Sequence, residues 1–86
     1  MNDAAELEPP RTLIEADHVL AGLRPRQQAP LAEWLAYHRQ AAAIYAEIAE
    51  IDRGHHHEAL FMAEHELKRA QEIEAQISIQ RRAGES

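Results

Sequence analysis

A single break in a long helix-favouring sequence constrains the fold of this chain most. The segment from Asp52 to Ala59 reads DRGHHHEA and lies between two long, alanine-rich amphipathic runs. Gly54 directly follows an apolar run, which is a helix stop signal, and Arg53 in the last turn supports a helix end there. At about 100° per residue the apolar stripes of both runs fall on nearly the same side, so their phase also allows one continuous helix. We favour a reversal at Gly54, because an unbroken helix would leave its stripe exposed.

Local signals place the other helix ends. Thr12 and Glu15 have the spacing of a capping box, in which the Thr12 hydroxyl accepts from the Glu15 amide and the Glu15 carboxylate accepts from the Thr12 amide. Pro25 ends this first helix, since the residue before a proline leaves the helical region. Pro30 suits the first turn of the next helix.

These signals predict an all-α chain, with a short N-terminal helix followed by a long antiparallel helical hairpin. The acidic, proline-ending N-terminus predicts a disordered arm, and the C-terminus a flexible tail. The predicted boundaries are an arm over 1–11, one helical domain over 12–80 with helices at 13–23, 31–53 and 56–80, and a tail over 81–86.

An apolar seam on the second helix predicts either the core of the monomer or a dimer interface. Its residues alternate by three and four, as in a heptad repeat. The helix over 13–23 is too short to cover two helices about twice its length, and a chain of 86 residues without cysteine has a marginal core. We therefore expect a homodimer that forms a helical bundle. The seam consists of Trp34, Tyr37, Ala41, Ile44, Ile48 and Ile51.

Composition limits the possible partners. The net charge of −6 argues against a nucleic-acid surface that covers the whole molecule, which would need a basic face. The acidic start lacks the basic and apolar segments of a signal peptide, and no apolar run approaches the roughly 18 residues of a membrane span. We expect a cytoplasmic protein without membrane contact.

The histidine triplet is the sharpest candidate for chemistry. His55, His57 and Glu58 could supply nitrogen and oxygen ligands to a divalent metal such as zinc. Consecutive residues on a helix diverge, however, so the alternative is that His56 packs at the hairpin crossing while its neighbours face solvent. Glu15 and His18 have the spacing of a ferritin-like carboxylate site, but no second copy of that motif exists.

No catalytic set is present, so we do not expect an enzyme. Glu47 and Glu50 are paired carboxylates that flank Ile48 on the rim of the seam, and acid–base chemistry needs a dehydrated cleft. The leading hypothesis is a non-enzymatic interaction or regulatory module that acts through protein–protein contacts as a homodimer. One alternative is a metal-binding sensor or carrier that uses the histidine cluster. A weaker one is an accessory DNA-binding subunit that acts through its arginine-bearing connector and tail.

Two resemblances accompany these patterns. The string EIAEIDRGHHHEALFMAEHELKRA resembles one tetratricopeptide-type hairpin, with Gly54, His56 and Ala59 at its glycine, aromatic-like and crossing positions; no second repeat follows. The stretch PLAEWLAYHRQAAAIYAEIAEIDRGHHHEAL is similar to a group of short actinobacterial proteins without assigned activity, which share Trp34, Tyr45 and the histidine block. That resemblance implies a compact helical protein and no particular function.

Overall fold

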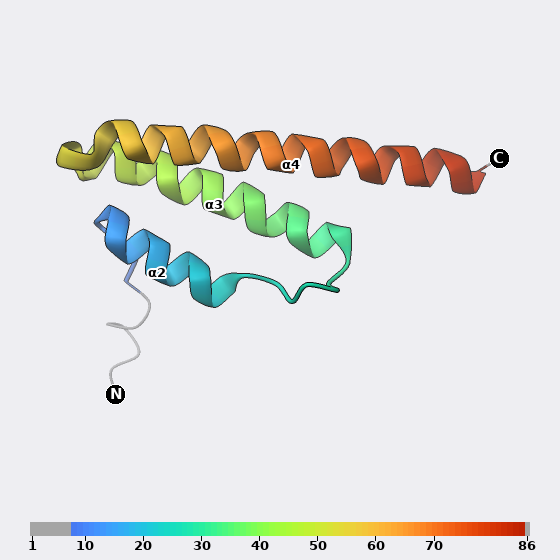
Figure 1. Ribbon diagram of the computed structural model, residues 1–86, viewed down its shortest axis with the longest axis horizontal. Coiled ribbons are helices and arrows are strands. Elements are labelled where there is room, and N and C mark those ends of the chain that lie inside the picture. Colours follow the sequence, from blue (N-terminus) through green and yellow to red (C-terminus); the bar gives the residue numbers. More distant parts are fainter. Residues whose placement is uncertain (1–7, 86) are drawn as a thin grey trace.

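The computed structural model describes residues 8–85, which form three α-helices and one short 3-10 turn (Figure 1). Helix α2 spans Leu13–Leu23, α3 spans Leu31–Ile51, the 3-10 turn η1 spans Arg53–His55, and α4 spans His56–Glu85. Helices α3 and α4 pack along each other as an antiparallel hairpin, and α2 lies against α3 (Figure 1). The prediction of an all-α helical hairpin is confirmed.

Only one of the two hydrogen bonds of the predicted capping box forms at the start of α2. The Thr12 hydroxyl accepts a hydrogen bond from the Glu15 amide at 3.1 Å, as expected. The Glu15 carboxylate accepts instead from the amide of Arg11 at 2.8 Å, one residue earlier than the expected Thr12. The Thr12 side chain therefore satisfies the Glu15 amide, one of the first-turn amides that have no partner inside the helix.

The reversal between α3 and α4 occurs where it was predicted, but glycine does not cause it. Helix α3 ends at Ile51, two residues before the expected end at residue 53, and Asp52 leaves the helical region with φ −100° and ψ 73°. No glycine within residues 8–85 has a positive φ, so Gly54 needs no left-handed conformation. The ring of His56 donates from Nδ1 to the carbonyl of Ala49 at 2.7 Å, which satisfies one of the last carbonyls of α3.

Asp52 also joins the turn to the first helix. Its carboxylate accepts from the amide of Leu13, the first residue of α2, at 2.9 Å. This amide is one of the helix donors that has no partner inside its own helix. A side chain from the hairpin turn thus caps a helix that lies 39 residues away in the sequence.

Alanines make up half of the main buried cluster and let the helices approach closely. The two buried tyrosines satisfy their hydroxyls: Tyr37 donates to the carbonyl of Leu20 at 3.2 Å, and Tyr45 donates to Asp17 at 2.6 Å. Ala59 is fully buried, which agrees with the crossing position expected from the tetratricopeptide-type pattern. The main buried cluster comprises Ala16, Leu20, Tyr37, Ala41, Tyr45, Ile48, Ala49 and Ala59.

The residues of the predicted seam differ in their burial within the chain. Tyr37, Ala41 and Ile48 are buried in the core, and that part of the seam is occupied by contacts within the chain. Trp34 and Ile44 are partly buried against the core. Ile51, at the end of α3, is exposed.

Helix α4 continues to Glu85, so it extends beyond its predicted end at residue 80 into the segment predicted as a flexible tail. That this segment is flexible stays a prediction. The arm predicted over 1–11 lies outside the described residues up to residue 7, and Glu8 to Arg11 belong to no helix. Within residues 8–85, no helix is long and apolar enough to cross a membrane.

The molecule is flat and elongated, with principal dimensions of 49 × 35 × 17 Å. The view down the shortest axis shows α2, α3 and α4 side by side, and α4 extends past the beginning of α3 (Figure 1).

Candidate functional site

The histidine triplet spreads over three different environments. Nδ1 of His55 lies 3.0 Å from the Asp52 carboxylate, and His56 is held on the end of α3. His57 and Glu58 are exposed and line a groove between α2 and α4. In the part of the chain that the structure describes, no group of three or more His, Cys, Asp or Glu side chains could hold a metal ion.

Zinc binding by His55, His57 and Glu58 therefore stays a prediction, for which one chain supplies no third converging ligand among residues 8–85. Calorimetric titration with zinc, nickel and copper tests it, with the double variant His55→Ala/His57→Ala as control. Glu15 and His18 are both exposed on α2, where they line a shallow pocket beside Pro9 and Pro10.

The carboxylate of Asp52 is held in its charged form. Its hydrogen bond from the Leu13 amide, and then its contact with His55, lower the pKa of Asp52 below the ordinary value. Partial desolvation opposes this shift without reversing it. The structural role of Asp52 is therefore tied to its ionisation.

An open, mostly apolar groove of about 430 Å³ lies between α2 and α4. Leu13 and Met62 line it together with Phe61, whose surface is 68% exposed. Asp17, His57 and Glu58 complete its rim. Such a large exposed aromatic ring in a groove is typical of a contact surface rather than of a core.

A second concave region lies between the connector, α3 and α4, and has a volume of about 450 Å³. At its base, Nδ1 of His38 is 2.5 Å from the carboxylate of Glu66. The ring of His38 stacks on Trp34 with centroids 5.8 Å apart, and the ring of Tyr37 meets it edge-on. We call this region the His38 cleft.

The sequence predictions included no residue of this cleft as a site residue except Trp34, which was assigned to the seam. The sequence nonetheless contains a signal that relates His38 to Glu66. His38 and Glu66 each lie fourteen residues from Asp52, on either side of the reversal, so the hairpin register itself brings them together.

A hydrogen-bonded pair, Tyr45 and Asp17, lies beside the α2–α4 groove. Burial, followed by its hydrogen bond to the Asp17 carboxylate, raises the pKa of the Tyr45 hydroxyl well above its ordinary value. The tyrosine therefore keeps its proton and orients Asp17 at the edge of the groove.

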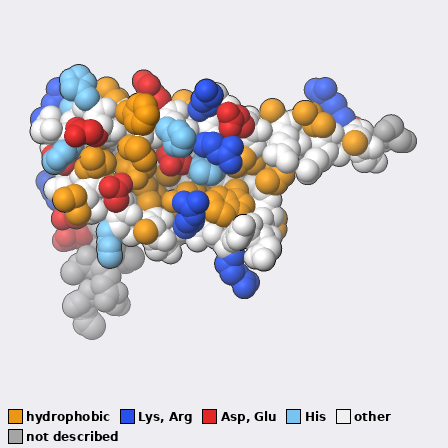
Figure 2. Space-filling model, viewed as in Figure 1, with side chains coloured by type: hydrophobic (Ala, Val, Ile, Leu, Met, Phe, Trp, Pro, Cys, Tyr) orange, Lys and Arg blue, Asp and Glu red, His pale blue; other side chains and the backbone are white. Residues whose placement is uncertain are grey.

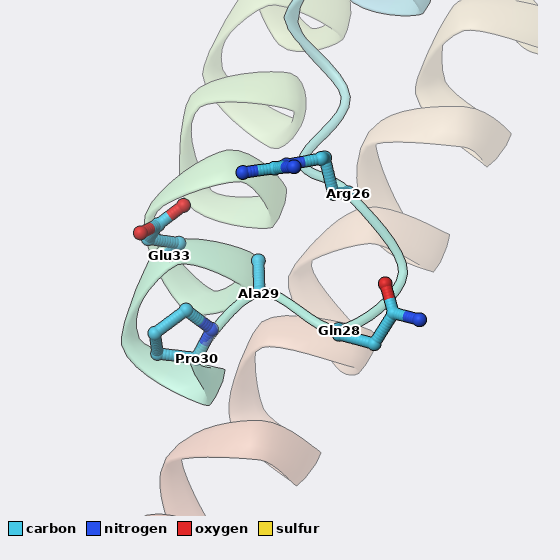
Figure 3. Close-up of a pocket in the computed structure, with 5 residues that line it drawn as sticks. All are labelled: Arg26, Gln28, Ala29, Pro30 and Glu33. Carbon is cyan, nitrogen blue, oxygen red and sulfur yellow. The ribbon is translucent and has the colours of Figure 1, made fainter.

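A third pocket, of about 310 Å³, opens on the connector (Figure 3). The side chain of Arg26 extends across Ala29 towards Glu33, with Gln28 and Pro30 completing the lining (Figure 3). Its floor holds no buried titratable group and little apolar surface, so we assign it no function.

No family model, no curated protein and no solved structure matches this chain, so its function has to be inferred from its geometry and chemistry.

Proposed function

We propose that the protein is a non-enzymatic helical interaction module that acts as a homodimer, joined through the α2–α4 groove. One observation carries this proposal: an apolar groove with an exposed Phe61 lies open between α2 and α4, on a molecule whose shortest dimension is 17 Å. Exposed apolar surface of this kind marks a contact site. A second copy is the occupant we propose, because a chain this small gains stability from a partner that buries this surface.

The surface around the groove has the composition of an interface. Hydrophobic side chains are exposed over much of this face, with charged side chains among them (Figure 2). In the groove itself, the apolar lining has Asp17, His57 and Glu58 at its rim. An apolar centre with a polar rim is the usual anatomy of a protein–protein contact. Phe61, which lines the groove with Leu13 and Met62, has the character of an anchoring residue at such a centre.

The area of the broad face also suits a dimer. A stable interface buries about 800 Å² on each partner, which a broad face of 49 × 35 Å can provide. In a two-fold dimer the same patch meets itself, so two grooves would each receive the partner's Phe61. The result is a two-layer bundle of the kind predicted from the sequence.

Sedimentation equilibrium at micromolar concentration tests the dimer. We expect a mass of twice 9.8 kDa for the natural chain. We expect Phe61→Ser to shift the equilibrium to monomer, because it removes the anchor without disturbing the core. Ile79→Ser is the matched control, since Ile79 is 64% exposed on α4 and does not line the groove.

A natural chain that stays monomeric over this range would contradict the proposal. So would equal loss of association in both variants, because the contact would then not depend on the groove. Circular dichroism of both variants establishes that each keeps its helical content.

A further inference from the structure

The His38 cleft combines two arginines, a buried histidine and apolar side chains in one concavity. Its volume of about 450 Å³ lies within the range of small-molecule pockets, roughly 300–1,000 Å³. Arg24 comes from the connector, His38 from α3 and Arg69 from α4, so three separate segments converge on it. It shares no lining residue with the α2–α4 groove.

The histidine at its base has one nitrogen engaged and one available. His38 is only 8% exposed, and Nδ1 faces the Glu66 carboxylate. Among the described residues, no fully buried side-chain nitrogen or oxygen lacks a hydrogen-bond partner. Nε2 of His38 makes no hydrogen bond to the residues that the structure describes and must therefore reach solvent, which it can do in the cleft that His38 lines.

Glu66 does not make the cleft repel an anion. Its carboxylate is largely buried and directed at His38, where it accepts a hydrogen bond from Nδ1. The negative charge of Glu66 is thus partly offset by this hydrogen bond.

The two arginines lie at the mouth with their charges accessible. The guanidinium carbon of Arg24 is 5.3 Å from the centre of the Trp34 ring, a cation–π contact that holds it on the wall. Arg69 pairs with Glu72 at 2.8 Å, but both side chains are about half exposed, and such ion pairs contribute little. Arg69 can therefore turn towards a ligand at small cost.

Apolar side chains complete the lining. Leu31 and the buried Ile73 face the same space as the two arginines. Guanidinium groups bind planar or tetrahedral oxyanions through two parallel hydrogen bonds. We infer that the His38 cleft binds a small organic anion, with its phosphate or carboxylate head between Arg24 and Arg69 and its apolar body against Leu31 and Ile73.

Trp34 supplies the readout, because it is the only tryptophan of the chain and lines the cleft. Its fluorescence is followed during titration with phenyl phosphate, benzoate and inorganic phosphate at constant ionic strength. We expect saturable binding with a Kd of about 1 mM or tighter for at least one organic anion. Whether phenyl phosphate or benzoate binds more tightly identifies the head group, and inorganic phosphate should bind more weakly than phenyl phosphate.

Arg69→Gln should weaken binding by at least about tenfold, because it removes a charged hydrogen-bonding group. Arg53→Gln is the control, since Arg53 is another exposed arginine, located in the turn of the hairpin and outside the cleft, and it should leave binding unchanged. Fluorescence changes that do not saturate, or that sodium chloride reproduces, would overturn the inference. Equal weakening by both variants would do so as well, since it would show non-specific attraction.

Discussion

At the scale of single residues, two polar contacts between distant segments hold the helices in place. Tyr45 on α3 is joined to Asp17 on α2, and Asp52 in the turn caps the first residue of α2. Both are contacts to α2, which is the shortest of the three helices and depends most on others for its position. Each contact also involves a group with a shifted pKa, so each makes a prediction about pH.

Tyr45→Phe should lower the free energy of unfolding by about 1–2 kcal/mol at neutral pH, because it removes a hydrogen bond to a charged group. The raised pKa of Tyr45 stabilises the folded state below the pKa of an unfolded tyrosine, about 10. Above that pH the unfolded chain loses the proton while the folded chain keeps it, so this stabilisation declines. Urea unfolding at about pH 8 and pH 11 should show a smaller difference between the two proteins at the higher pH. A difference that is the same at both would contradict the assignment.

Asp52→Asn should destabilise the protein at neutral pH, and Asp52→Ala should do so more, since the amide oxygen can still accept from Leu13. The lowered pKa of Asp52 means that its stabilisation is present above the unfolded value of 3.8 and is lost as the pH falls through the folded value. Thermal unfolding between neutral and strongly acidic pH should therefore bring the natural protein and Asp52→Asn together at the acid end. Glu47→Gln, an exposed change on α3, serves as control and should have little effect at any pH.

At the scale of the elements, the hairpin turn depends on side chains more than on glycine. Asp52 leaves the helical region, and the ring of His56 satisfies the carbonyl of Ala49 across the turn. Gly54 has an ordinary φ, and a Cβ placed on it would meet nothing within 4 Å. The glycine is compatible with the turn without being required by it.

Gly54→Ala should consequently raise the free energy of unfolding by about 0.4–1 kcal/mol, because alanine restricts the unfolded chain. A left-handed glycine at this position would have given the opposite sign, a loss of about 1–2 kcal/mol. Chemical unfolding distinguishes the two signs. Gly22→Ala in α2 also meets open space and should be stabilising in the same experiment.

At the scale of the whole molecule, the open groove between α2 and α4 is the property with the largest consequences. Helix α2 has 11 residues and α4 has 30, so α2 covers only part of α4 and leaves Phe61 exposed beside it. A chain this small has little core energy of its own. Association of two copies would therefore stabilise the folded chain as well as bury its exposed apolar surface.

If the dimer forms, its folded state should be favoured by mass action. We expect the Tm of the natural protein to rise with protein concentration over the micromolar range, and the Tm of Phe61→Ser to be independent of concentration. Scanning calorimetry at two concentrations about 100-fold apart measures this directly. A natural protein with a constant Tm would contradict the homodimer.

The sequence by itself determined the helices and their order. Capping residues, prolines and apolar spacing act over three or four neighbouring residues, so Thr12, Pro25 and Pro30 marked their boundaries correctly. The end of α4 was misplaced because the chain carries no strong stop signal near residue 80, and helix ends without such signals depend on their surroundings.

Only the tertiary structure decided which side chains meet. The contact of His38 with Glu66 joins residues 28 positions apart, and the cap of Asp52 on Leu13 joins residues 39 positions apart. The exposure of Phe61 depends on where α2 lies. Such pairs follow from the register of the hairpin and the placement of α2 against it, which local spacing leaves open. The histidine block drew attention in the sequence because its members are adjacent there, whereas converging ligands must be adjacent in space.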